Sequence, residues 1–98
     1  MRLTDAQVKR TAKYLNIDTR KLPVKILKTG MKVELEHGAQ DKRTNVTNND
    51  LILTAKITIA HIIEIPDYYD RLAKLEKEAK RYWKGTRKMN PFKKSPTI

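Results

Sequence analysis

The fold of this chain is decided by the stretch Ala60-His61-Ile62-Ile63-Glu64-Ile65-Pro66-Asp67-Tyr68-Tyr69. It holds one of the two histidines, a glutamate three residues later, and a proline that must interrupt a helix because it has no backbone N–H. Asp67, directly after the proline, is a suitable residue to begin a second helix. The stretch therefore predicts a corner between two helices, with His61 and Glu64 on one face of the first helix.

The segment that leads into this corner, residues 51–65, has features of both a strand and a helix. Apolar and polar residues alternate in its first half, and β-branched side chains are frequent, so propensity alone favours a strand. The segment is fifteen residues long, however, and it is framed by capping residues at 47–50 and by Pro66. We therefore expect a helix over residues 51–65.

The segment after the corner has the clearest helical pattern, over Tyr68 to Lys84. Charged residues occupy one side, and Gly85 is expected to end the helix. The apolar stripe consists of Tyr68, Leu72, Leu75, Ala79 and Tyr82 or Trp83. Residues 85–98 contain two prolines, several basic residues and little to bury, which predicts an extended or disordered basic tail.

Two further helices are expected before residue 30. Thr4 can cap a first helix over Asp5–Leu15, in which apolar residues recur on one face. Thr19 can cap a short second helix through about residue 28, and Gly30 then reads as its end.

The middle of the chain is less regular. Residues 31–37 alternate between apolar and polar, which predicts a short strand, although one or two helical turns fit the same residues. Residues 38–50 form a polar loop. The fold class is therefore all-α, a compact bundle of four to five short helices in a single domain of residues 1–84, followed by the basic C-terminal tail at 85–98.

Composition restricts the kind of protein this can be. The formal net charge is +11, and it is concentrated at both ends: residues 1–29 carry eight Lys or Arg against two Asp, and residues 77–98 carry eight against one Glu. The chain has no cysteine, which excludes disulfides and zinc–thiolate sites. No stretch has the apolar length of a secretory signal or a membrane span, so we expect a location in the cytoplasm or within a virus particle.

The two histidines and nearby carboxylates form the first candidate site. His37 and His61, with Glu34 or Glu36 and with Glu64, could supply a first shell for zinc, iron or manganese. The other interpretation is a buried polar cluster in which carboxylates fix the imidazoles, and the absence of a His-Glu-x-x-His signature favours it. No residue is expected to be catalytic.

Basic residues interleaved with aromatic ones form the second candidate site. Such a pattern can pair with phosphates and stack on bases, so it points to an anionic partner, either nucleic acid or an acidic protein surface. A merely solvated charged surface is the alternative. The candidate binding residues are Lys80, Arg81, Trp83, Lys84, Arg87, Lys88, Lys93 and Lys94.

The segments Glu34-Leu35-Glu36-His37-Gly38 and Ala60–Tyr69, the second followed by Leu72, carry a resemblance. The chain is similar to a small family of domains of unknown function found in bacteria, phages and large DNA viruses. The resemblance implies a phage or viral setting and no established activity. It also implies a compact helical domain in which six residues meet: Glu36, His37, His61, Glu64, Asp67 and Tyr69, the last two as support for the corner.

The sequence thus predicts a non-enzymatic accessory or structural protein, a component of a phage or virus particle that binds an anionic partner through its basic ends. Other virion proteins are expected among its partners, and a membrane is not. The alternative is a metal-binding module or metal-dependent enzyme that uses His37, His61 and Glu64.

Overall fold

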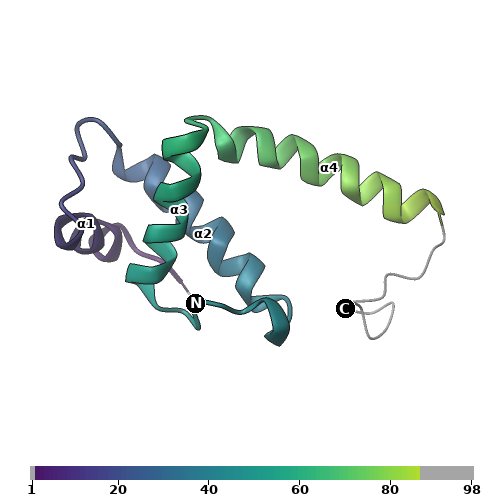
Figure 1. Cartoon of the computed structure of the whole chain (residues 1–98), viewed down its shortest axis with the longest axis horizontal. Helices are drawn as coiled ribbons and strands as arrows, with labels where there is room; N and C mark the ends of the chain where they lie inside the picture. The colour runs from purple at the N-terminus through teal and green to yellow at the C-terminus, as the bar shows by residue number, and fades with distance from the viewer. Residues whose placement is uncertain (1, 87–98) are drawn as a thin grey trace. The chain divides into compact units, whose positions relative to one another are not determined.

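The computed structural model describes residues 2–86, and these residues contain helices and no strand (Figure 1). The helices are α1 (Asp5–Tyr14), α2 (Val24–Ala39), the short 3-10 helix η1 (Lys42–Thr44), α3 (Leu51–Glu64) and α4 (Tyr68–Thr86). The chain divides into two units between Tyr68 and Tyr69, so that α1, α2 and α3 share the first unit. The prediction of an all-α fold is confirmed.

Helix α1 agrees with the sequence prediction to within one residue. The Thr4 side chain accepts a hydrogen bond from the Gln7 backbone N–H at 3.2 Å, and the Gln7 side chain accepts one from the Thr4 N–H at 2.8 Å. This capping box satisfies two backbone donors that a helix start otherwise leaves unpaired. The helix ends at Tyr14, and Asn16 then adopts a positive φ of 57°, which reverses the chain.

The predicted start of the second helix at Thr19 was wrong. Asp18 instead organises a turn, since its side chain accepts from the Arg20 N–H at 2.9 Å and its carbonyl accepts from the Leu22 N–H at 2.9 Å. Helix α2 begins only at Val24, with Pro23 as its N-cap. Proline is tolerated at a helix start because the backbone N–H groups there have no partner within the helix, so its missing N–H costs no hydrogen bond.

The predicted strand over residues 31–37 and the predicted helix end at Gly30 were also wrong, and the helical alternative was right. Helix α2 runs without interruption through both, and Gly30 is buried inside it. The alternation of residues 31–37 is too short to outweigh the four-residue spacing of Leu27, Met31 and Leu35, which places all three on one face of a helix. All three are buried.

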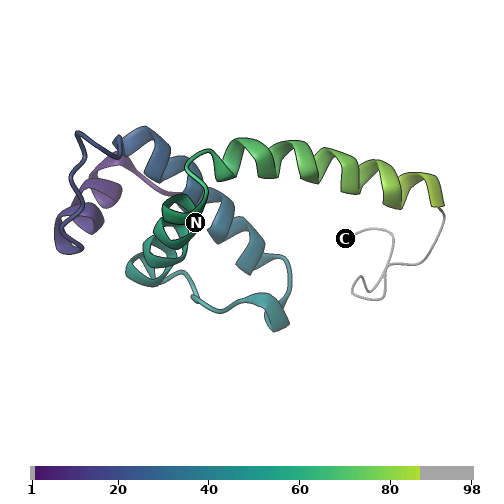
Figure 2. The same cartoon turned by 45° about the horizontal axis from the view of Figure 1, so that its top comes forward.

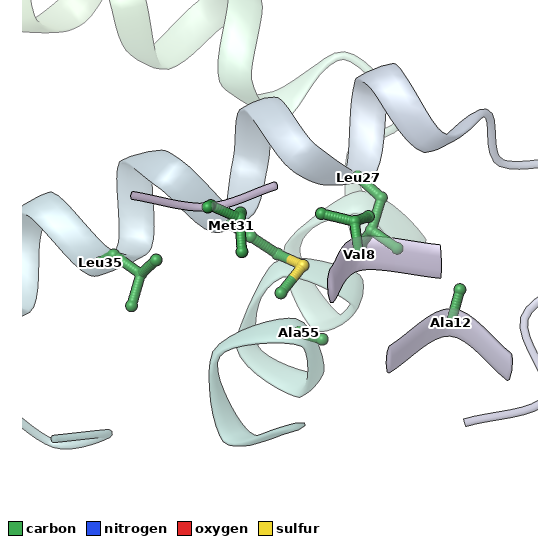
Figure 3. Close-up of a cluster of buried hydrophobic side chains, with 7 residues drawn as sticks. Val8, Ala12, Leu27, Met31, Leu35 and Ala55 are labelled. Carbon is green, nitrogen blue, oxygen red and sulfur yellow. The ribbon is translucent and has the colours of Figure 1, made fainter. Parts of the chain in front are cut away.

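The core of the first unit forms around that face of α2 (Figure 3). Leu27, Met31 and Leu35 lie along α2 and meet Val8 of α1 and Ala55 of α3. Figures 1 and 2 show α3 lying against α2 from both directions of view. Helix α2 is thus the element that brings α1 and α3 into one structure.

Helix α3 forms as predicted, over Leu51–Glu64, despite its β-branched residues. Asp50 caps it by accepting from the Leu53 N–H at 3.0 Å. Two buried threonines, Thr54 and Thr58, donate their hydroxyl hydrogens to the carbonyls of Asp50 at 2.7 Å and Thr54 at 2.9 Å. Because each hydroxyl finds its partner inside the helix, these polar side chains can lie in the core without an unpaired donor.

Helix α4 begins at Tyr68 as predicted and extends to Thr86, past the expected end at Gly85. Helix ends are defined only to within one or two residues, so the difference is small. Residues 87–98, which include most of the predicted basic tail, lie outside the described residues.

Replacing Leu27 by alanine should destabilise the first unit by about 2–5 kcal/mol, because the side chain is fully buried and its loss leaves a cavity. The neighbouring Ile26→Ala is the matched control, since Ile26 is 47% exposed and should cost far less. Urea unfolding followed by circular dichroism measures both. Equal losses for the two variants would contradict the assignment of the core.

The Asp5–Lys28 pair joins α1 to α2 and gives a pH-dependent prediction. The Lys28 ammonium donates to Asp5 at 2.8 Å, and this hydrogen bond, followed by the positive charge, holds the pKa of Asp5 below its ordinary value of 3.8. A lowered pKa in the folded state means that the contribution of the pair to stability is present above the unfolded pKa. That contribution is lost as the pH falls through the folded pKa.

The variant Lys28→Gln should therefore raise the pKa of Asp5 toward 3.8, as measured by NMR titration of the carboxyl carbon. Asp18 is the internal control, because its pKa is lowered by hydrogen bonds from Arg20 that this variant leaves intact. A Lys28→Gln protein with an unchanged Asp5 pKa would show that the pair does not form in solution.

Candidate functional site

A carboxylate and an imidazole from different helices meet at the centre of the first candidate site. Glu34 Oε2 on α2 lies 3.2 Å from His61 Nδ1 on α3. The Glu34 side chain is 11% exposed and that of His61 is 35% exposed. At this distance the imidazole Nδ1–H can donate to the carboxylate, which fixes the orientation of the ring. The pair therefore links α2 to α3 and leaves part of the imidazole accessible.

Tyr68 covers one face of the same imidazole. The two ring centroids are 4.2 Å apart and the planes differ by 12°, so the rings are stacked. The turn between α3 and α4 sets this arrangement: the Ile65 N–H donates to the His61 carbonyl at 2.8 Å, and the Tyr68 N–H donates to the Ile65 carbonyl at 2.9 Å. Pro66 cannot continue α3, so the chain turns at this point. The turn brings Tyr68 onto the imidazole of His61, seven residues earlier in the sequence.

The predicted cluster of Glu36, His37, His61 and Glu64 does not include Glu34, yet Glu34 is the carboxylate paired with His61. The geometry of a helix gives the reason. In a strand, Glu34 and Glu36 share a face. In a helix they lie about 200° apart, and Glu34 falls within about 20° of Leu27 on the buried face. Accordingly Glu34 is largely buried, and Glu36 is exposed.

The other predicted members differ in burial. His37 is half-buried one turn after Glu34 on α2, and its carbonyl accepts from the Thr44 hydroxyl at 3.3 Å. Glu64 is exposed at the end of α3. Of the predicted corner supports, Asp67 is exposed and Tyr69 is half-buried. The supporting role of these two residues stays a prediction.

Metal binding gains no support from this arrangement. Within residues 2–86, no group of three or more His, Asp or Glu is positioned to hold a metal ion. The Glu34–His61 pair supplies two ligand atoms, whereas structural and catalytic zinc sites use at least three protein ligands.

The glycine that follows His37 has a structural explanation. Gly38 is buried against the loop that joins η1 to α3, and a Cβ on it would lie 3.3 Å from the Asn45 amide oxygen. That oxygen accepts from the Asn48 N–H at 2.9 Å. Within the segment Glu34–Gly38, Glu34 pairs with His61, Leu35 lies in the core, and Gly38 allows the loop at Asn45 to approach the helix closely.

The second candidate site lies on α4, where the predicted basic residues share one face. Lys80, Arg81 and Lys84 are exposed, and so is Lys77, which was not among the predicted residues. Lys77 lies three and four residues before Lys80 and Arg81, and Lys84 lies four and three residues after them, so the four cations share one side of the helix. Lys77, Lys80 and Arg81 together line a surface depression. Trp83 is also exposed, and its ring lies edge to face with that of Tyr82, with the two ring centroids 5.1 Å apart. Of the remaining predicted binding residues, Arg87, Lys88, Lys93 and Lys94 lie outside the described residues.

Several cations of the first unit, by contrast, are paired with acidic residues. Arg20 lies 3.2 Å from Asp18, and Lys28 lies 2.8 Å from Asp5. Arg43 forms a forked pair with Asp41, and the hydrogen bonds that the guanidinium donates to the Asp41 carboxylate raise the pKa of Arg43 above its ordinary value. These pairs partly neutralise the positive charge of the first unit.

A family model matches residues 8–78 of the chain. The chain belongs to the family DUF5661, whose description is "Protein of unknown function". The match includes α2, α3, the corner and the first part of α4, so the Glu34–His61 pair lies inside the DUF5661 domain and most of the basic face of α4 lies at or beyond its end. No curated protein and no solved structure matches.

The described helices were also compared with the length and hydropathy of a membrane span. None of the helices in residues 2–86 is both long enough and apolar enough to span a bilayer.

The Glu34–His61 pair makes a stability prediction with a matched control two residues away. Glu34→Gln should destabilise the DUF5661 domain by about 1 kcal/mol, because the amide keeps the shape but loses the charged acceptor for His61. Glu36→Gln makes the same chemical change at an exposed position and should cost much less. Chemical unfolding at neutral pH measures both. Equal losses of unfolding free energy for the two variants would show that His61 is not paired with Glu34.

Proposed function

We propose that this DUF5661 protein is a non-enzymatic accessory or structural protein that binds nucleic acid through its basic ends. We place it in the cytoplasm or within a phage or virus particle. The resemblance of the paired segments to proteins of phages and large DNA viruses supports the setting. An acidic protein surface is the competing anionic partner. The proposal makes the basic face of α4 the main contact.

The basic face of α4 is the observation that carries the proposal. Lys77 and Lys84 are seven residues apart, so with a rise of 1.5 Å per residue the face extends over about 10 Å. Phosphates along one nucleic-acid strand repeat every few ångströms, so such a row of cations can neutralise several at once. An isolated charged side chain could not do this.

The composition of the face supports nucleic acid over an acidic protein. Trp83 lies beside Lys80 and Lys84 on the helix surface, and an exposed indole next to cations can stack on an unpaired base. The positive charge continues at both ends of the sequence, within a chain of net charge +11. Binding of this kind depends on phosphates, so we expect little preference for base sequence.

Removing three cations from the face should weaken binding to DNA. The full-length variant Lys77→Gln/Lys80→Gln/Arg81→Gln lowers the net charge from +11 to +8 and keeps helix-forming residues. Fluorescence anisotropy with a labelled DNA should show affinity reduced by at least about tenfold at low salt. The slope of log K against log salt should also become shallower by roughly 3, because one released counterion is lost per cation.

The control variant Lys32→Gln/Lys42→Gln/Lys56→Gln makes the same change in net charge at exposed positions outside the basic ends. It should leave both affinity and salt slope close to those of the unchanged protein. If the two variants weaken binding equally, diffuse charge rather than the α4 face is responsible. If the unchanged protein binds neither DNA nor RNA at low salt, nucleic acid is not the partner.

A further inference from the structure

Helix α1 presents a second basic face, on its exposed side. Val8 and Ala12 of this helix are buried in the core (Figure 3). Lys9, Arg10 and Lys13 are all exposed. At about 100° per residue, these three cations fall within about 100° of the helix circumference, so they form one face. The core contacts of α1 therefore leave this basic face of α1 on the surface.

The two acidic residues closest to α1 in sequence are engaged by cations from outside this face. Asp5, the single acidic residue of α1, accepts from the Lys28 ammonium at 2.8 Å. Asp18, in the turn after α1, lies 3.2 Å from the Arg20 guanidinium. Among residues 2–86, the three cations of the α1 face form no ion pair. Their charge is therefore available to an anion from outside the chain.

The three cations of the α1 face also repel one another. Lys9 and Lys13 are four residues apart, so their like charges lie one turn from each other. The Lys9 charge is partly offset by Asp5, and that of Lys13 by the helix dipole in the last turn. Arg10 has neither compensation. A bound polyanion would relieve this repulsion, because each cation would then face a phosphate.

An exposed aromatic ring adjoins this face. Tyr14 is 73% exposed and lies four residues after Arg10, so the two side chains are neighbours on the helix surface. Proteins that bind single-stranded nucleic acid combine cations, which pair with phosphates, and aromatic rings, on which unpaired bases stack. Tyr14 and the α1 face supply both parts on one helix.

Helix α4 carries the same arrangement. The pattern Lys-Arg-x-x-Lys occurs in both helices, at residues 9–13 and at residues 80–84. An exposed aromatic residue adjoins the final lysine in each case, Tyr14 in α1 and Trp83 in α4. One helix belongs to the first unit and the other to the second. The two faces can therefore be altered and tested separately.

We infer that α1 carries a second nucleic-acid contact, which favours single strands: Lys9, Arg10 and Lys13 pair with phosphates, and Tyr14 stacks on an unpaired base. The inference rests on the proposed function, which supplies nucleic acid as the class of partner. Single-stranded DNA and RNA share the required chemistry. In a duplex the bases are stacked on one another and offer Tyr14 no free surface, so only the cations contribute.

Substitutions at Tyr14 in the full-length protein test the preference for single strands. Tyr14→Leu removes the aromatic ring at an exposed position, so the affinity for a labelled strand of about 20 thymidines should fall at least about fivefold at low salt. The affinity for a duplex of the same length should change by less than about twofold. Tyr14→Phe keeps the ring and should recover the single-strand affinity.

A matching strand of uridines distinguishes RNA from DNA, and the tighter of the two names the strand that the α1 face prefers. Equal losses for the single strand and the duplex, or no loss for the single strand, would overturn the inference. So would a Tyr14→Phe protein that binds as weakly as Tyr14→Leu.

The variant Lys9→Gln/Arg10→Gln/Lys13→Gln tests the cations of the α1 face. Single-strand affinity should fall at least about tenfold, and the slope of log K against log salt should become shallower by roughly 2. The charge-matched control variant described above should keep both close to the unchanged protein. If the α4 variant weakens binding and the α1 variant does not, the inference fails and the proposed function stands. If only the α1 variant weakens binding, the inference stands and the α4 contact fails.

Discussion

Burial of one face of α2 is the constraint on which the rest of the first unit depends. Leu27, Met31 and Leu35 can leave water only if α1 and α3 cover them, and the capping of both helices allows them to do so. The same face carries Glu34 into a largely buried position. A buried carboxylate is costly without a polar partner, and His61 on α3 supplies one. The core and the polar pair therefore stabilise the same contact between α2 and α3.

The sequence was sufficient for those elements whose signals are local. Helix α1, helix α3, the Pro66 corner and the start of α4 all follow from caps, from proline and from spacing on the helix. Helix α2 was misassigned because Gly30 and a short alternation imitate a helix end and a strand. The helix continues through this region because its apolar face packs against α1 and α3, and these contacts with other segments cannot be read from the local pattern. The sequence left open whether Glu34 or Glu36 is the partner of His61, because a strand places both on one face whereas a helix places them on different faces.

The basic face of α4 and the core around α2 act through different forces. The basic face acts at a distance through charge and is sensitive to salt, whereas the core acts at contact through apolar burial. Salt therefore bears mainly on α4, and a substitution in the core bears mainly on the first unit.

The β-branched composition of α3 has a consequence for what happens when the core opens. Its isoleucines and threonines favour extended chain over helix, and the hydroxyls of Thr54 and Thr58 donate to carbonyls one turn earlier in the helix. Loss of the α2 contact therefore frees an apolar segment, Leu51 to Ile59, that carries a single charge, Lys56. Such segments pair edge to edge and aggregate. The packing of α2 on α3 thus also protects the protein from self-association as amyloid-like sheet during synthesis or heating.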